Sequence, residues 1–314
     1  MKKKIIFGIA APIAMIGFPI FAISCASNKL NSEIIKLNTK DNLYQKFDVT
    51  DFHNVGKIFD TKVKYNIRKD GIRVPVEQTL WEYFNYAEGE IVNLADGDTM
   101  TVRITQQPKI LPNGSTITLS NTIKIRIPLI DTLEENTSNV GEEEKRLAHI
   151  DSEYARSMLP VGAKVRMISK NWNDKSYDRV VASVFFGENF TRNFAIEMLA
   201  AGYTLAKIEK VNVIDFLADY NKPEDEAREL YSYTIPYAAY AINYGILNKK
   251  GFYGEPHNFK DPYVLASKYL EHGEALINSS LFILHPSLWA KNAIKSNSEN
   301  NIYKFLESKN QNKE

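Results

Sequence analysis

The chain has 314 residues, of which 44% are hydrophobic and 25% are charged, a composition that suits one sizeable core or two small ones. Its formal net charge of +1 excludes a global basic field as the means of attracting an anionic partner. Any anion-binding site must therefore come from a local arrangement of cations.

The N-terminus has the three-part pattern of a secretory signal. Three lysines at positions 2–4 precede an apolar run over 5–23, and Cys25, the only cysteine, follows it. This position predicts a lipoprotein signal peptide over 1–24 and a lipid anchor on Cys25, which would hold the chain at the extracellular face of the cell membrane. An uncleaved membrane helix and an ordinary cleaved signal are the alternatives. Loss of the three lysines would leave 36 Lys and Arg against 38 Asp and Glu, a net charge of −2.

Residues 25–87 are predicted to be a tether and an N-terminal extension. The polar stretch from 26 to about 45 lacks sustained periodicity, as a tether does. Short alternating segments follow, with a turn signal at Asp70-Gly71, and "VEQTLWEYFNY" predicts one short helix.

From Glu88 the pattern becomes rich in β-strand signals. Strands are predicted in the segments 89–105, 117–131, 163–169 and 179–186, the first of which contains two strands joined by a turn at 95–98. Helices are predicted over 142–159 and 191–203. Short strands with one embedded helix predict an α+β fold, a five-stranded OB-type β-barrel with packed helices. A two-sheet sandwich is the competing architecture.

After Pro223 the chain is predicted to be helical, and residues 251–314 are expected to form a helical C-terminal extension. Four tyrosines at helical spacing, Tyr233, Tyr237, Tyr240 and Tyr244, are expected to pack one helix against the barrel. Stacking on nucleobases is the alternative role. Pro236 predicts a kink or a break in this segment.

Polar residues gather where the predicted strands end. Asp96 and Asp98 flank Gly97 in a tight turn. The segment "RIPLIDTLEE" is predicted to be a barrel strand that fixes the spacing between Arg126 at one end and the turn 131–134 at the other. The remaining candidates are Asp131, Thr132 and Glu134 in that turn, and Tyr177 and Arg179 at the start of a later strand.

These residue types suit phosphodiester hydrolysis when they are combined. Two aspartates and a backbone carbonyl form an oxygen-only site for a hard ion such as Ca²⁺ or Mg²⁺. Two arginines can bind the non-bridging oxygens of a phosphodiester, and a nearby glutamate can orient or deprotonate a water molecule. Alone, each motif is more often a hairpin turn, a helix cap or a surface residue.

Four segments, "ADGDTMTV", "IRIPLIDTLEE", "DKSYDRVVASVFF" and "NFAIEMLAAGYTLAKI", resemble the thermonuclease (staphylococcal nuclease-like) family. The resemblance covers about residues 88 to 210, more loosely to about 250, and predicts a domain of this type over 88–250. It implies a calcium site at Asp98, Asp131 and the Thr132 carbonyl, with Asp96 beside it. It also implies that Glu134 orients the attacking water, that Arg126 and Arg179 bind phosphate, and that Tyr177 lies near a terminal phosphate.

Together with the lipid anchor, the chain is similar to the surface membrane nucleases of wall-less bacteria. The resemblance implies a Ca²⁺-dependent phosphodiesterase, Mg²⁺ being possible, that hydrolyses extracellular DNA and RNA to 3′-phosphate products for nucleotide scavenging. Two positions depart from the family, because Leu133 replaces a proline and Asp178 replaces a glycine. The alternative function is a non-catalytic surface lipoprotein, an adhesin or nucleic-acid receptor built on the same barrel. Nothing in the sequence predicts the oligomeric state.

Overall fold

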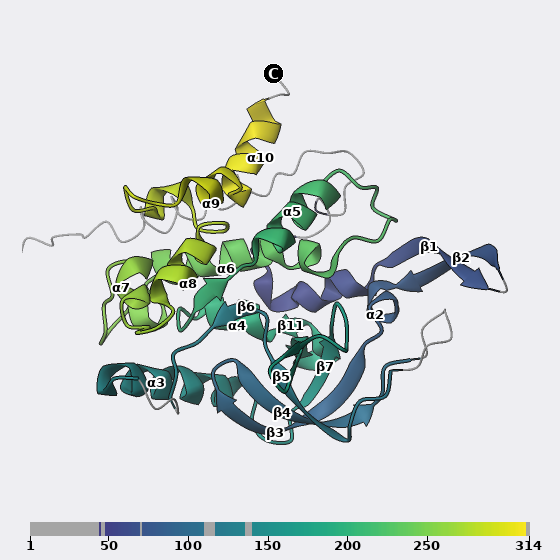
Figure 1. Cartoon of the computed structure of the whole chain (residues 1–314), viewed down its shortest axis with the longest axis horizontal. Coiled ribbons are helices and arrows are strands. Elements are labelled where there is room, and N and C mark those ends of the chain that lie inside the picture. Colours follow the sequence, from purple (N-terminus) through teal and green to yellow (C-terminus); the bar gives the residue numbers. More distant parts are fainter. Residues whose placement is uncertain (1–43, 45–47, 70, 110–116, 136–139, 312–314) are drawn as a thin grey trace, which may run out of the picture.

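A curled sheet with helices packed around it forms the centre of the structure (Figure 1). The computed structural model describes residues 44, 48–69, 71–109, 117–135 and 140–311. The signal segment 1–24 and Cys25 lie outside these residues.

The central sheet has eight strands. They are β3 (Ala87–Asp96), β4 (Thr99–Gln106), β5 (Thr122–Arg126), β7 (Lys164–Ile168), β8 (Lys175–Ser176), β9 (Arg179–Val181), β10 (Ser183–Phe186) and β11 (Arg192–Asn193). Their order across the sheet is β11-β10-β7-β3-β4-β5-β9-β8, and only the β5–β9 pair is parallel. The sheet curls into a half-barrel.

The predicted α+β class is confirmed, while the five-stranded OB-type barrel stays a prediction. The sheet has more strands than expected, because the segment 179–186, predicted as one strand, forms both β9 and β10, and because β8 and β11, each two residues long, were not predicted. Strands this short carry too little alternation to be recognised in a sequence.

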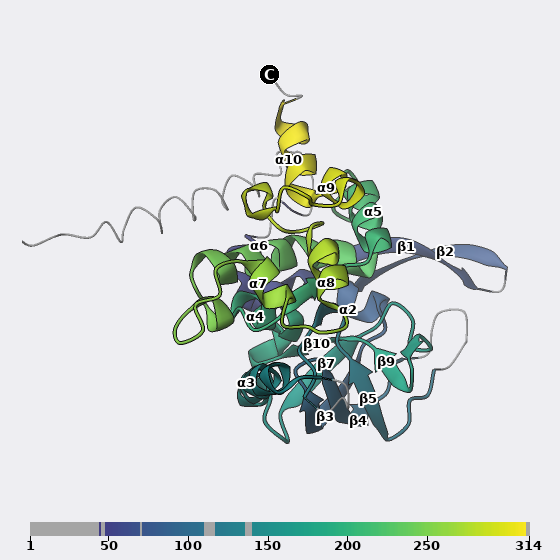
Figure 2. The ribbon, with the colours of Figure 1, turned by 60° about the vertical axis from the view of Figure 1, so that its left-hand side comes forward.

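Two further pairs of antiparallel strands lie outside the central sheet, β1 (Lys62–Lys69) with β2 (Ile72–Thr79) and β6 (Leu129–Asp131) with β12 (Leu205–Lys207). The β1–β2 hairpin projects from the body of the molecule in both views (Figures 1 and 2).

The helical segments of the described chain cover the sheet or lie above it (Figure 1). They are η2 (Phe52–Asp60), α2 (Leu80–Tyr83), α3 (Glu142–Met158), η3 (Glu188–Phe190), α4 (Phe194–Ala200), α5 (Lys210–Asp219), η4 (Leu230–Tyr233), α6 (Ile235–Leu247), η5 (Gly251–Tyr253), α7 (Pro262–Ala266), α8 (Gly273–Ser280), η6 (Pro286–Leu288), α9 (Lys295–Glu299) and α10 (Ile302–Gln311). None of those helices has both the length and the apolar character needed to cross a bilayer.

Helix α3 confirms the helix predicted over 142–159. It begins with three glutamates, which its N-terminal dipole favours, and it ends before Pro160. Its buried stripe includes Leu147, Asp151 and Ala155, so that a carboxylate lies on the face turned toward the sheet.

One hydrophobic core joins the N-terminal extension, the sheet and the C-terminal helices. Phe59 of η2 packs against Trp81 and Phe185, with ring centroids 4.9 and 5.1 Å away. Leu284 and Tyr303 of the C-terminal segment are also buried in it. The ends of the described chain therefore help to stabilise the sheet that carries the candidate site.

The tyrosine prediction is confirmed for packing. Tyr233, Tyr237 and Tyr240 are buried and Tyr244 is partly buried against the core. The predicted break also occurs, since α6 begins immediately before Pro236. Proline is favoured there because the first turn of a helix needs no intrahelical N–H donor.

The segment "RIPLID" is not one strand, which corrects the sequence-based prediction. β5 ends at Arg126, and β6 begins at Leu129, whose φ of 71° is left-handed. Pro128 cannot donate to a strand ladder, and the chain turns there. Five extended residues would have separated Arg126 from Asp131 by about 16 Å, whereas the turn brings the two side chains into contact.

Candidate functional site

Arg126 joins the two predicted aspartate ligands. Its guanidinium forms ion pairs with both Asp98 and Asp131. The three side chains are largely buried, with exposed fractions of 11% for Arg126, 1% for Asp98 and 8% for Asp131. Residues from two separate segments of the sequence therefore form one polar cluster.

Arg179 is connected to the same cluster through Thr99. Its Nη1 atom donates to Thr99 Oγ1 over 2.9 Å, and that hydroxyl donates to Asp98 Oδ1 over 3.1 Å. Tyr177 is 92% exposed, and its ring centroid lies 6.0 Å from the Arg179 guanidinium carbon. Both arginines are thus at the cluster, and Tyr177 lies at its solvent-facing side.

The turn after β6 holds the other predicted residues close by. The backbone N–H of Thr132 donates to Asp98 Oδ2 over 3.2 Å, and Glu134 is partly buried. Asp96 accepts a hydrogen bond from the backbone N–H of Asp98 over 3.3 Å. Gly97 is required between the aspartates, because a Cβ atom there would lie 2.6 Å from Thr132 Cγ2.

The cluster is rich in carboxylates, and their repulsion is visible in Asp98. Burial raises the pKa of Asp98 to about 7, although Arg126 opposes the shift. The nearby charges of Asp96 and Glu134 raise this pKa further. A cation that reached the cluster would relieve this repulsion.

Asp178 and Leu133, the two positions that depart from the family that the sequence resembles, both have partners in the structure. The Asp178 carboxylate forms an ion pair with Lys124 at 2.7 Å, which is the main cause of its lowered pKa. Its negative charge is therefore countered by Lys124. Leu133 has a backbone N–H that a proline would lack, and this N–H donates to Asp151 Oδ2 over 3.3 Å.

Asp151 and Lys207 are cluster residues that the sequence analysis missed. Asp151 is fully buried on α3, and burial raises its pKa well above the usual value, with added repulsion from Asp98. Its place on the apolar stripe of α3 was a readable signal. The Lys207 Nζ atom lies 3.3 Å from Asp131 Oδ1. This contact forms because β12 pairs with β6, a pairing that no local sequence pattern indicated.

Two hydroxyl groups also hold the backbone at the end of β6. Thr204 and Tyr269 both donate to the carbonyl oxygen of Asp131, over 2.8 and 2.9 Å. Tyr269 belongs to the C-terminal segment, for which the sequence offered no chemistry.

A hard divalent ion would find oxygen donors at this cluster, the carboxylates of Asp98 and Asp131 and nearby carbonyls, beside the cationic groups of Arg126 and Lys207. The described residues contain no group of three or more His, Cys, Asp or Glu side chains placed so that they could hold a metal ion. A metal bound here would therefore rest on two carboxylates, a carbonyl and water.

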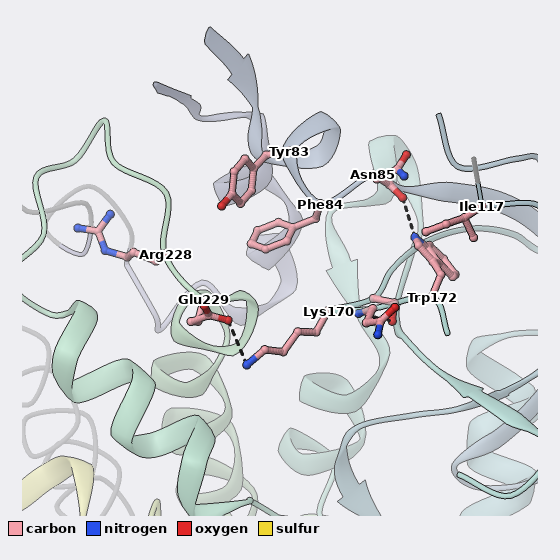
Figure 3. A pocket seen from close by; sticks show the side chains of 10 residues that line it. Tyr83, Phe84, Asn85, Ile117, Lys170, Trp172, Arg228 and Glu229 are labelled. Carbon is pink, nitrogen blue, oxygen red and sulfur yellow. Dashed lines mark hydrogen bonds and ion pairs between the residues drawn. The ribbon is translucent and has the colours of Figure 1, made fainter. Parts of the chain in front are cut away.

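A separate cavity of about 410 Å³ lies among α2, the loop after β7 and η4 (Figure 3). Tyr83, Phe84 and Trp172 line it, and Lys170 crosses it to reach Glu229 at 3.1 Å. None of the predicted site residues lines this cavity.

No family model matches the chain. An uncharacterized lipoprotein of Mycoplasma genitalium is 39% identical over 90 residues, which cover 26% of this chain and 34% of the relative. The match thus spans about a third of the relative's length. The relative's description is consistent with a lipid-anchored membrane protein.

Proposed function

We propose that the chain is a lipid-anchored, metal-dependent nuclease of the thermonuclease type. The observation that carries the proposal is the contact of Arg126 with both Asp98 and Asp131. Ion pairing across separate strands gathers a phosphate-binding group and two oxygen ligands at one point, as phosphodiester hydrolysis requires. The curled half-barrel supports the predicted OB-type domain.

The residues fit a Ca²⁺ ion, with Mg²⁺ as the second choice. Asp98, Asp131 and the Thr132 carbonyl would hold it, with Asp96 close by. The burial of Asp98, which raises its pKa, and the nearby charges of Asp96 and Glu134 support this assignment, because a cation would stabilise the ionised carboxylate. When bound, the ion would neutralise charge on the phosphate and favour an attacking hydroxide.

The side chains of the cluster divide the remaining tasks. Arg126 and Arg179 would bind the non-bridging oxygens and stabilise the extra charge of the pentacoordinate phosphorane. Glu134 would align a water molecule and accept its proton as the water oxygen bonds to phosphorus. The bond from phosphorus to O5′ breaks, leaving a 3′-phosphate and, after protonation, a 5′-hydroxyl. Tyr177 would lie beside the phosphate.

The substrates would be extracellular DNA and RNA, met at the outer face of the membrane to which Cys25 is anchored. A lipoprotein among the similar proteins supports this location. The second candidate is a receptor or adhesin that uses the same cluster without catalysis. It is favoured by one observation, that the carboxylates of Asp98 and Asp131 are already paired with Arg126.

The test is digestion of plasmid DNA by the full-length chain purified in detergent. We expect cleavage with Ca²⁺ that stops with a chelator, and loss of cleavage in a Glu134→Gln/Arg179→Ala double variant. A Lys260→Gln variant, altered at an exposed lysine, is the control and should cleave normally. Full activity of the double variant would show that the assignment is wrong. Binding without cleavage would favour the receptor.

A further inference from the structure

The β1–β2 hairpin, residues 62–79 and hereafter the basic ribbon, is an unusual projection. Its two strands pair along eight positions from Lys62↔Thr79 to Lys69↔Ile72, and it extends away from the body in two views (Figures 1 and 2). Near its base, the backbone N–H of Lys64 donates to the Asp225 carbonyl over 2.7 Å. A two-stranded hairpin by itself is only marginally stable in water, so its length calls for a partner.

Charge is concentrated on this ribbon. Residues 62–79 contain five Lys and Arg against two Asp and Glu, a net charge of +3, whereas residues 25–314 together carry −2. Outside the ribbon the mature chain therefore has a net charge of −5. A local basic surface of this kind attracts polyanions even where the whole molecule would repel them.

The register places the charges on one face. Residues that lie directly opposite each other share a face, and Arg68 lies opposite Arg73, while Lys64 lies opposite Glu77. The four basic side chains that the structure describes on this face are all exposed, Lys62, Lys64, Arg68 and Arg73, and of these Lys64 forms an ion pair with Asp225 at 3.0 Å. The other face carries Tyr65, Ile67, Val74 and Val76, which are partly buried.

The arginine pair at the tip is the most informative feature. Like charges directly opposite each other destabilise a ladder, and neither Arg68 nor Arg73 has an ion pair with any described residue. Lysines and Pro75 on open edges are explained by protection against edge-to-edge pairing. Protection of an edge does not explain why two arginines face each other. A bound anion between them would explain it.

We propose that the basic ribbon is a nucleic-acid-binding arm that holds the phosphate backbone of a long polynucleotide. A two-stranded β-ribbon fits the major groove of a duplex, and arginine binds phosphate in a bidentate manner. A lipid surface is the less favoured partner. Among the large apolar side chains described in the ribbon, only Ile72 is strongly exposed, at 68%, too little to insert into a bilayer.

The arm and the candidate active site lie at opposite ends of β3. The ribbon leads through α2 into the start of β3, and Asp96 is the last residue of that strand. Ten residues of strand span about 30 Å, the length of about nine base pairs. This inference rests on the proposed function, and it specifies long polymers as the substrates. Shorter duplexes would reach the catalytic cluster without reaching the arm.

The experiment measures duplex binding by an Arg68→Gln/Arg73→Gln variant of the full-length chain in chelator, where no cleavage occurs. For a duplex much longer than nine base pairs, we expect the slope of log affinity against log salt to fall by about 2, because two phosphate contacts are lost. For a shorter duplex, binding and Ca²⁺-dependent cleavage should not change. The variant should fold at least as stably as the parent, since the change removes a like-charge pair.

A Lys260→Gln/Lys291→Gln variant is the matched control, because it removes the same charge from exposed positions outside the ribbon. An equal loss in both variants, or no loss in either, would overturn the proposal. So would normal duplex binding combined with a lost preference for phosphatidylserine vesicles over neutral ones, which would assign the ribbon to lipid. Because binding is measured without catalysis, a chain that binds but never cleaves would refute the proposed nuclease and leave the arm standing.

Discussion

At the scale of single residues, Leu133 and Asp151 form a pair at a position where the sequence departs from the family that it resembles. The Leu133 N–H lies in the turn between Thr132 and Glu134, and the buried Asp151 carboxylate accepts it. A proline at 133 would need no acceptor. Asp151 therefore acts as a positioning residue, which holds the turn from the side of α3.

This pairing predicts a rescue. Asp151→Leu leaves a buried N–H without a partner, which should cost about 1–3 kcal/mol of unfolding free energy and weaken Ca²⁺ binding. Adding Leu133→Pro removes that N–H and should restore much of both. Asp151→Asn, which keeps an acceptor oxygen, controls for the loss of charge. Calorimetric unfolding and Ca²⁺ titration measure the effects, and absence of any recovery in the double variant would contradict the pairing.

The raised pKa of Asp98 predicts how the free energy of unfolding depends on pH when a chelator removes divalent ions. Its pKa is raised by burial to about 7 in the folded chain, against about 3.9 when unfolded. The protonated form is thus favoured by folding, and its stabilisation is lost as the pH rises from about 4 to about 7. Thermal unfolding of Asp98→Asn should show a smaller decline over this range. Asp178→Asn, at an exposed carboxylate, should decline like the parent, and an equal decline in Asp98→Asn would argue against the shift.

At the scale of elements, the C-terminal extension supports the candidate site directly. Tyr269, between α7 and α8, donates to the Asp131 carbonyl, and its hydroxyl is buried. The carbonyl belongs to a predicted metal ligand, so that the position of the β6 turn depends on a segment more than 130 residues away in the sequence.

Tyr269→Phe should therefore lower both stability and Ca²⁺ affinity. Loss of one hydrogen bond costs about 1 kcal/mol, and the loosened turn should bind the ion less tightly. Tyr263→Phe is the control, because the Tyr263 hydroxyl accepts from the Ala290 N–H within the same extension. Equal Ca²⁺ affinities in the two variants would show that the Tyr269 contact does not reach the site.

The elements also show what a sequence can predict. Alternation and turn chemistry predicted β3 and β4, and an acidic start followed by a proline stop predicted α3. The break at Pro128 was readable too, but the apolar run around it favoured one strand. Lys207 could not be predicted, because its contact with Asp131 depends on long-range pairing of two three-residue strands.

At the scale of the whole molecule, charge is divided between two places. In the candidate site Arg126 is buried among carboxylates, whereas the arginines of the basic ribbon are exposed to solvent. In the proposed function, a chain that carries −2 over residues 25–314 would bind nucleic acid at these two places and repel it elsewhere. A lipid anchor on Cys25 would keep both places at the membrane surface.

Metal-titrated digestion of DNA and RNA by the full-length chain, with analysis of the product ends, tests the nuclease assignment most directly. The account predicts cleavage that rises with Ca²⁺, stops with a chelator, and leaves 3′-phosphate and 5′-hydroxyl ends. Products with 5′-phosphate ends, or cleavage that continues in chelator, would contradict it.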